Sequence, residues 1–198
     1  MEKQLPIYRL DISEDENSNV EVDFVALVDR PAIEKGFLAF NESKLLFAIQ
    51  DEEERIISGP LMLADTPIYR YDANGEYYVV FTKETIKKIA QKYFKKGYQS
   101  NVNLMHDNGQ VVEDVTMFES WIVDEKRGIK PMTGYEEVKD GSWFGSFKVE
   151  NDNVWEMIKE GKVKGFSVEG VFNYRSSGIS NPQEMMKSII EILKQVSL

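Results

Sequence analysis

One serine and the single histidine of this 198-residue chain are the side chains whose types could together support nucleophilic chemistry. His106 ends an apolar run that begins at residue 102, and Ser167 lies between glycines in the segment 165–170. In a strand, Ser167 and Glu169 would point to one face. A serine hydroxyl needs an adjacent base at neutral pH, and an imidazole, with a pKa of about 6.5, is the usual one. We therefore predict Ser167 as nucleophile and His106 as general base, against the plainer interpretation of a loop histidine and a structural serine.

A catalytic histidine also needs a third group that fixes its tautomer. Glu119 lies in an otherwise apolar predicted strand soon after the histidine. Glu169 would share a face with Ser167, Asp107 adjoins the histidine, and Asp23 interrupts a long N-terminal strand. Spacing alone leaves all four acids open, because each would also suit a solvated strand or loop.

Composition excludes several other kinds of site. The chain has no cysteine, which rules out a cysteine nucleophile, a disulfide framework and a thiolate zinc site. With one histidine a two-histidine metal site is impossible. A rival metal-dependent hydrolase would have to use oxygen ligands, as magnesium does, around His106 with Asp107, Asp114 and Glu119. We predict neither a metal nor another cofactor.

Net charge and hydropathy limit the possible binding partners and the cellular compartment of the protein. A net charge of −10 disfavours nucleic acid and anionic membranes. No apolar run approaches the roughly 20 residues that a membrane span requires, and the first residues lack the apolar stretch of a secretory signal. We expect a soluble cytoplasmic protein that binds neither nucleic acid nor membrane.

Hydrophobic periodicity predicts the elements that would position these residues. Period-two alternation indicates many short strands, and the Asn-Gly pair at 74–75 indicates a hairpin. Apolar residues recur at helical spacing over 82–94, with Thr82 as cap, and a short helix follows over 151–159. A third helix starts at 181–184. The sum predicts an α+β fold, a mostly antiparallel closed or nearly closed β-barrel with two or three peripheral helices.

Several stretches resemble one known family in order and approximate spacing. From about Tyr77 to Phe172 the chain is similar to the XkdF-like family of phage prohead proteases, and the Lys-Gly-Phe-Ser pattern at 164–167 is the most specific part. The matching stretches are residues 103–107, 119–124, 141–144, 148–152 with Trp155, and 161–170.

The resemblance implies a serine endopeptidase with the fold of the wider prohead protease group and of the herpesvirus assemblins. It implies a barrel with histidine and serine on neighbouring strands, and by motif match these are His106 and Ser167. It implies cleavage of phage scaffold and major capsid proteins inside the immature procapsid in the host cytoplasm, with a homo-oligomer possible. Within the narrower family Glu119 matches, so we favour it as third member, with Glu169 and Asp23 as alternatives.

Two departures from the wider group qualify this picture. Little chain follows Ser167, and the segment 25–32 resembles the strand that comes after the serine in that group. A circularly permuted barrel over residues 1–178 would explain both. Residues 179–198 would form an amphipathic helix that packs on the barrel or contacts another copy or a capsid component. A non-catalytic phage structural protein that keeps the barrel is the alternative.

Overall fold

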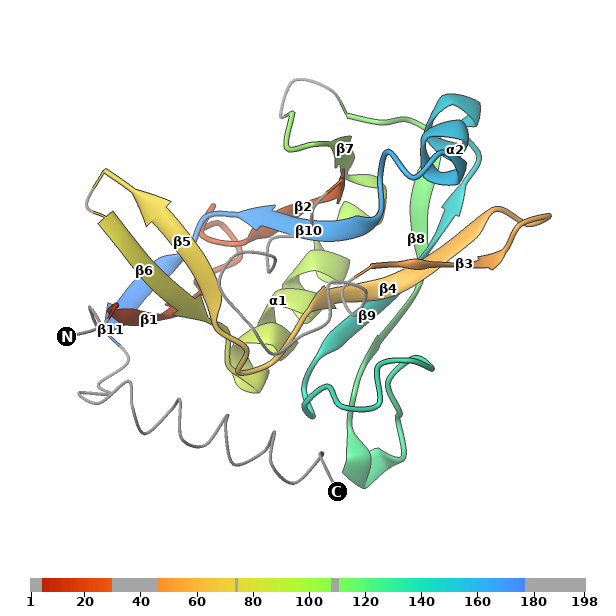
Figure 1. Cartoon of the computed structure of the whole chain (residues 1–198). Helices are drawn as coiled ribbons and strands as arrows, with labels where there is room; N and C mark the ends of the chain where they lie inside the picture. The colour runs from red at the N-terminus through yellow and green to blue at the C-terminus, as the bar shows by residue number, and fades with distance from the viewer. Residues whose placement is uncertain (1–4, 30–45, 74, 108–110, 177–198) are drawn as a thin grey trace.

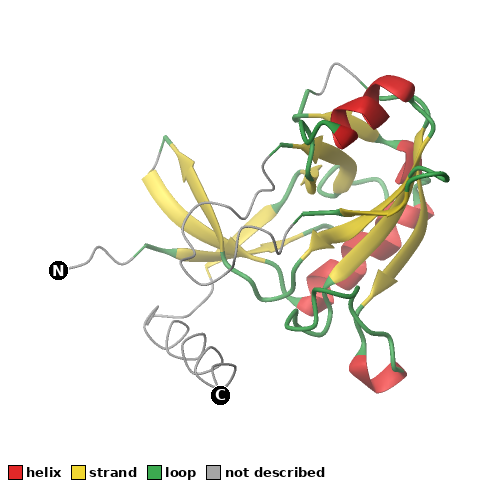
Figure 2. Ribbon diagram, turned by 45° about the vertical axis from the view of Figure 1, so that its right-hand side comes forward, coloured by secondary structure: helices red, strands yellow, loops and turns green. Residues whose placement is uncertain are grey.

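The structure is a computed structural model that describes residues 5–29, 46–73, 75–107 and 111–176 (Figure 1). Within these residues the chain forms three separate sheets and two α-helices (Figure 2). The predicted helix over 179–198 lies outside the described residues. The boundary at residues 178 and 179 therefore stays a prediction.

A four-stranded antiparallel sheet contributes several of the large core side chains. Its order is β3 (Ala48–Asp51), β4 (Ile56–Met62), β9 (Trp143–Val149) and β8 (Val115–Ile122). Trp143 and Phe147 of β9 are fully buried. Burying one large apolar side chain stabilises a fold by about 1.5–3 kcal/mol, so these residues anchor the sheet.

A second sheet contains the expected hairpin. β5 (Ile68–Asp72) pairs with β6 (Gly75–Val80) in antiparallel register, which confirms the predicted hairpin, with Gly75 as the first residue of the return strand. β1 (Ile7–Asp11) runs parallel to β6 and antiparallel to β11 (Asn173–Ser176). One face of this sheet carries Leu10, Ile68 and Val79 toward the core.

The third sheet is small and carries the functional candidates. β2 (Val22–Val28) is central, with β10 (Gly165–Gly170) antiparallel on one side and β7 (Val102–Leu104) parallel on the other. Val25 and Leu27 of β2 are completely buried and belong to the main core. The sequence placed these strands correctly, but a parallel pairing between segments 77 residues apart, such as Val25 and Val102, leaves no local signal.

Both described α-helices begin at side-chain caps. In α1 (Lys83–Lys95) the Thr85 N–H donates to Thr82 Oγ1 at 3.2 Å, which confirms the predicted cap. In α2 (Asp152–Lys159) Asn151 plays the same part for Val154. Ile86, Ile89 and Tyr93 line the buried face of α1. No helix among the described residues is long and apolar enough to cross a membrane.

The barrel prediction, permuted or not, is wrong, because the three sheets remain open. β1 and β11 pair in one sheet, whereas β2 and β10, which belong to the same two stretches of chain, pair in another. The stretch with β1 and β2 and the stretch with β10 and β11 thus pass together from one sheet to the next. They do not extend a single sheet. β10 lies against β4 without pairing with it, and the Phe166 ring packs on Phe147 of β9 with centroids 4.7 Å apart, so no ladder closes the ring of strands.

A buried ion pair joins α1 to the loop before β2. Lys92 Nζ lies 2.9 Å from Glu21 Oε2, and both side chains are less than 10% exposed. The same ammonium donates to the carbonyl oxygens of Ser13, Asp15 and Ser18 at 2.8–3.2 Å. The loop therefore wraps around a cation supplied by the helix.

Candidate active site

Strand register brings Ser167 and Asn103 to one face of the three-stranded sheet. Ser167 of β10 pairs with Ala26 of β2, and Ala26 pairs with Asn103 of β7. Side chains at paired positions point to the same face of a sheet. Glu169, two residues along β10, pairs with Phe24 and belongs to this face too. The small Ala26 side chain leaves a gap across β2 through which Glu169 and Asn103 meet.

The opposite face of this sheet is the core. Val25, Leu27, Val102 and Phe166 are buried there in the main hydrophobic cluster. Shifting β10 by one residue would move Phe166 to the polar face and Ser167 into the core. The shift would expose an apolar ring and bury a hydroxyl group, and both changes would destabilise the fold. Burial of the apolar set thus fixes which way Ser167 and Glu169 point.

His106 is held by a tight turn at the end of β7. Met105 and His106 have φ angles of 52° and 63°, and the Asp107 N–H donates to the Leu104 carbonyl at 2.9 Å. Two consecutive positive φ values inside such a bond describe a type I′ turn, which favours asparagine and glycine. Here each side chain in this conformation costs about 1–3 kcal/mol, and such strain gathers at functional sites.

Two bonds from the β2 side pin this turn in place. The Met105 N–H donates to the Leu27 carbonyl at 3.0 Å, and the Met105 sulfur lies 3.3 Å from the Asp29 nitrogen. The imidazole is therefore carried on a fixed backbone, although its side chain is 47% exposed.

Glu169 connects His106 and Asn103. His106 Nδ1 lies 3.1 Å from Glu169 Oε1, and the Asn103 amide donates to the same oxygen at 2.7 Å. Asn103 is completely buried, so its amide holds the carboxylate from below the surface. An imidazole that donates Nδ1–H to a carboxylate keeps Nε2 free of a proton, which is the tautomer a general base requires.

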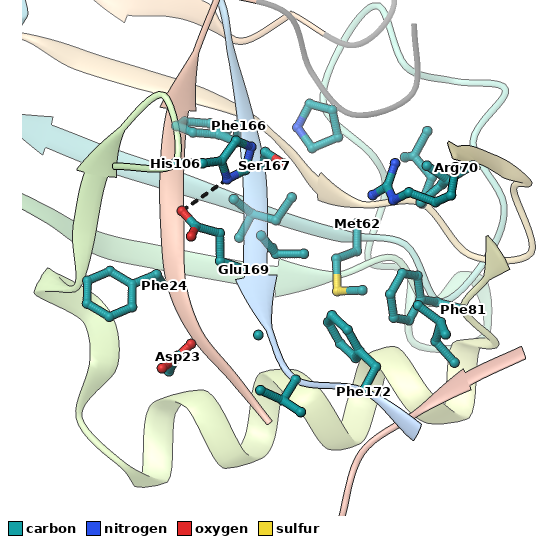
Figure 3. A pocket seen from close by; sticks show the side chains of 18 of the residues that line it. Asp23, Phe24, Met62, Arg70, Phe81, His106, Phe166, Ser167, Glu169 and Phe172 are labelled. Carbon is teal, nitrogen blue, oxygen red and sulfur yellow. Dashed lines mark ion pairs between the residues drawn. The ribbon is translucent and has the colours of Figure 1, made fainter. Parts of the chain in front are cut away.

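Ser167 and His106 line one pocket of about 850 Å³ between β10, β4 and the β5–β6 sheet. In Figure 3 the His106 ring projects over β10 at Ser167, and the dashed line joins it to Glu169. Ser167 is only 5% exposed, so a substrate would reach it through this pocket. The remaining walls are largely apolar and include Leu61, Met62 and Phe81.

Asp23 lies at the same pocket, at an irregularity of the β2–β10 pairing. The register passes from Phe24 opposite Glu169 to Val22 opposite Gly170, so Asp23 is the extra, bulged residue of β2. Burial raises the pKa of Asp23, and the charges of Glu21 and Glu169 add to the rise. Opposite the bulge, a Cβ on Gly170 would lie 2.1 Å from the Glu21 carbonyl oxygen, so only glycine fits this approach.

Residues 44–175 match the family model described as "Putative phage serine protease XkdF". The chain belongs to this family. The chain is also 26% identical over 161 residues to the phage-like element PBSX protein XkdF of Bacillus subtilis (strain 168), covering 77% of this chain and 53% of that protein. It is 26% identical over 188 residues to the uncharacterized protein YqbD of the same organism, covering 89% and 53%.

The chain spans about half the length of these curated relatives. No solved structure matches it. Membership of the XkdF family confirms the resemblance found in the sequence and identifies a phage protein, and the serine protease activity is part of the family's description. The roles of individual residues rest on the geometry above.

The structure brings together Ser167, His106 and Glu169 but not Glu119. Glu119 lies exposed on β8, opposite Ser146 in the large sheet, and is not among the residues that line the pocket. Glu119 thus matches the XkdF family pattern but does not lie beside His106. His106 lies in the turn after β7 and not on a strand, and β7 does not pair directly with the β10 strand of Ser167, since β2 lies between them.

The metal-site residues of the rival hypothesis do not converge. Among the described residues no group of three or more histidine, aspartate and glutamate side chains is arranged to hold a metal ion. Asp107 is exposed in the turn after His106. Asp114 has a φ of 61° before β8, where its carbonyl accepts from Glu150 and Asn151.

Sequence reasoning overlooked Asn103 as a functional residue. The signal available in the sequence was an asparagine between Val102 and Leu104 in an otherwise apolar run, and the structure shows that it is fully buried. Buried amides are nearly always hydrogen-bonded, which would have predicted a polar partner on the same face. Nothing in the sequence identifies that partner as Glu169, which is 66 residues away.

Proposed function

We propose that the chain is a serine endopeptidase in which Ser167 is the nucleophile, His106 the general base and Glu169 the residue that orients the imidazole. The observation that carries this proposal is the contact of His106 Nδ1 with Glu169 Oε1 at one end of the pocket that Ser167 also lines. Family membership supports the class of chemistry.

The proposed reaction proceeds in two halves. His106 Nε2 takes the proton of the Ser167 hydroxyl as Oγ bonds to the substrate carbonyl carbon, and it returns that proton to the leaving amine as the C–N bond breaks. A water molecule then gives His106 a proton and attacks the acyl-enzyme, and the proton returns to Oγ as the ester bond breaks. Throughout, the Glu169 carboxylate stabilises the imidazolium that forms twice in each turnover.

The proposed substrates are the scaffold and major capsid proteins of the phage that encodes this chain, cleaved within the procapsid. Confinement there would raise the effective substrate concentration toward the millimolar range, on the order found for tethered partners. A largely preformed but open pocket would then need only modest intrinsic affinity. Association with a second copy or a capsid component through residues 179–198 is part of this proposal.

Replacing the nucleophile tests the proposal directly. Ser167→Ala should lower turnover of a co-expressed scaffold protein by roughly 10⁴-fold or more, because the covalent step is lost. It should also abolish labelling by a fluorophosphonate, which reacts with activated serines. Ser146→Ala is the matched control, since Ser146 is also a buried strand serine but its hydroxyl bonds Ser58 at 2.8 Å.

Two outcomes would contradict the proposal. If wild-type protein is neither labelled nor active on scaffold or capsid protein in assembling procapsids, the non-catalytic structural alternative holds. If Ser167→Ala keeps full activity while Ser146→Ala loses it, the nucleophile has been assigned to the wrong strand.

A further inference from the structure

Asn103 lies on a strand that is held by hydrogen bonds on both of its sides. On the β2 side the Met105 N–H donates to the Leu27 carbonyl at 3.0 Å. On the other side the Val112 N–H donates to the Val102 carbonyl at 2.8 Å. The backbone that carries the Asn103 amide is therefore fixed from two directions, which makes it a rigid support for whatever the amide contacts.

Only one end of the Asn103 amide is used in a hydrogen bond within the described part of the chain. Its Nδ2 donates to Glu169 Oε1 at 2.7 Å, whereas its Oδ1 is buried and has no hydrogen-bond partner among these residues. A carboxylate accepts hydrogen bonds and donates none, so the end of the amide that faces Glu169 has to be the NH2 group. A buried carbonyl oxygen without a partner destabilises a fold, and an apolar residue here would avoid that cost. Stability therefore does not account for the asparagine, whereas its bond to Glu169 does.

Glu169 depends on few contacts to stay beside His106. Both of its hydrogen-bonding contacts in the described part of the chain, to His106 Nδ1 and Asn103 Nδ2, are made by the same oxygen, Oε1. Asp23 lines the same pocket, and the charge of Glu169 contributes to the raised pKa of Asp23, so the two carboxylates repel each other. Without the Asn103 amide, this repulsion and the access of solvent would both favour rotation of the Glu169 carboxylate away from the imidazole.

We propose that Asn103 is a positioning residue, whose amide holds Glu169 Oε1 against His106 Nδ1 and thereby keeps the imidazole in the tautomer with an unprotonated Nε2. This inference rests on the proposed protease function and adds a further residue to it. Asn103 is not among the residues that line the pocket, so it acts through Glu169 and does not touch the substrate. The bond crosses β2 at Ala26, where a larger side chain would stand between the two groups.

The single histidine allows a direct measurement of this role. Nitrogen NMR of the full chain, labelled in its histidine and studied at a pH at which the ring is neutral, gives the ratio of the Nδ1–H to the Nε2–H tautomer of His106. Asn103→Ala should lower this ratio by about twofold to tenfold, the equivalent of one hydrogen bond. A purely structural role of Asn103 would leave the ratio unchanged in the molecules that remain folded.

The same substitution should slow the reaction of Ser167 only while Glu169 is present. Asn103→Ala should lower the rate of labelling by a fluorophosphonate by about tenfold to hundredfold, as is typical for residues that orient the ligands of a metal. In the Glu169→Gln background the same change should lower the rate by less than about twofold, because the group through which Asn103 acts has been removed.

Asn101→Ala is the matched control. The Asn101 amide also donates to the β2 segment, at 2.9 Å, but its acceptor is the Asp23 carbonyl oxygen and not Glu169. This variant should keep the wild-type tautomer ratio and labelling rate. Should Asn103→Ala not fold, Asn103→Thr replaces it, because threonine has a similar volume and suits a strand, while its hydroxyl is one bond short of the amide nitrogen. If neither variant folds, Asn103 is a residue of the fold and the proposal is overturned.

The two readouts separate this proposal from the proposed function. A lower tautomer ratio in Asn103→Ala supports the positioning role even if cleavage is never observed, whereas a wild-type protein that is neither labelled nor active contradicts the protease function alone. An unchanged tautomer ratio in folded Asn103→Ala protein overturns the positioning role. A loss of labelling that is equally large with and without the Glu169 carboxylate overturns it too, because Asn103 would then not act through that group.

Discussion

Two glutamates on adjoining segments have opposite surroundings. Glu21, just before β2, is contacted by Lys92 at 2.9 Å, by the Tyr98 hydroxyl at 2.9 Å and by Lys96 at 3.3 Å. Glu169, on β10, is contacted by the Asn103 amide and by the ring of His106. Their side chains are 8% and 16% exposed, so burial alone hardly separates them.

The two glutamates differ in the groups that contact them. Burial on its own would raise the pKa of Glu21, but the bonds from Lys92, Tyr98 and Lys96 outweigh it and hold that pKa below its usual range. Two lysines keep their charge at any physiological pH, so this cluster is static. Glu169 instead faces an imidazole, a group that can both take up and release a proton, beside an open pocket. A carboxylate with a titratable, half-exposed partner is suited to chemistry, and one enclosed by permanent cations is suited to holding the fold.

The largest expected effect is on the catalytic side of this comparison. Glu169→Gln should lower kcat by roughly 10³–10⁴-fold, because an amide favours the wrong imidazole tautomer. The free energy of unfolding should change by about 1 kcal/mol or less, since the amide preserves shape and most contacts. Steady-state kinetics and urea unfolding measure the two quantities. A loss of less than tenfold in kcat would show that another acid orients His106.

The cluster around Lys92 and Glu21 should show the opposite pattern, in which a substitution lowers stability but not turnover. Lys92→Met should lower the free energy of unfolding by about 3–5 kcal/mol, because it leaves Glu21 and three carbonyl oxygens short of a partner. Turnover per folded molecule should stay near the wild-type value. Lys88→Met is the control: Lys88 pairs with Glu14 at an exposed site, so its loss should change the free energy of unfolding far less. Equal effects of the two substitutions would mean that Lys92 is not a structural centre.

Acid should weaken the Glu21 cluster in a defined window. Because the pKa of Glu21 is lowered in the folded protein, its contribution is complete above the ordinary value of 4.5 and is lost as pH falls through the folded-state pKa. Glu21→Gln should therefore flatten the decline in unfolding free energy below about pH 4.5. Urea unfolding at pH 3 to 6 for both proteins makes the comparison. Parallel declines would show that Glu21 does not bind protons differently on folding.

The smallest effect is expected at the acid that the family pattern favoured. Glu119→Gln, on the exposed side of β8, should change kcat by less than about twofold and the free energy of unfolding by less than about 0.5 kcal/mol. Measured beside Glu169→Gln, it is the matched glutamate control. A severe loss at Glu119 with normal stability would reverse the assignment of the third residue.

The sequence predicted local features well because local physics determines them. Thr82 caps α1 as expected, and the strand alternation that joins Ser167 to Glu169 is consistent with their common pocket. The closed barrel was wrong because strand partners come from distant segments, as with β1 beside β6. The contact of Asn103 with Glu169 depends on β2 passing between their strands with Ala26 at the crossing. No spacing rule along the chain contains that information.

Gly170 restricts how this sequence can vary. It is exposed, yet any side chain there would collide with the backbone at Glu21 and Val22. Surface positions usually accept almost any residue, so exposure would suggest tolerance at this position. Here the two segments that carry Glu21 and Glu169 touch backbone to backbone, and the absence of a Cβ at Gly170 permits this contact. Substitution would therefore disturb the stability cluster and the pocket wall in a single step, which ties two otherwise independent properties to one surface residue.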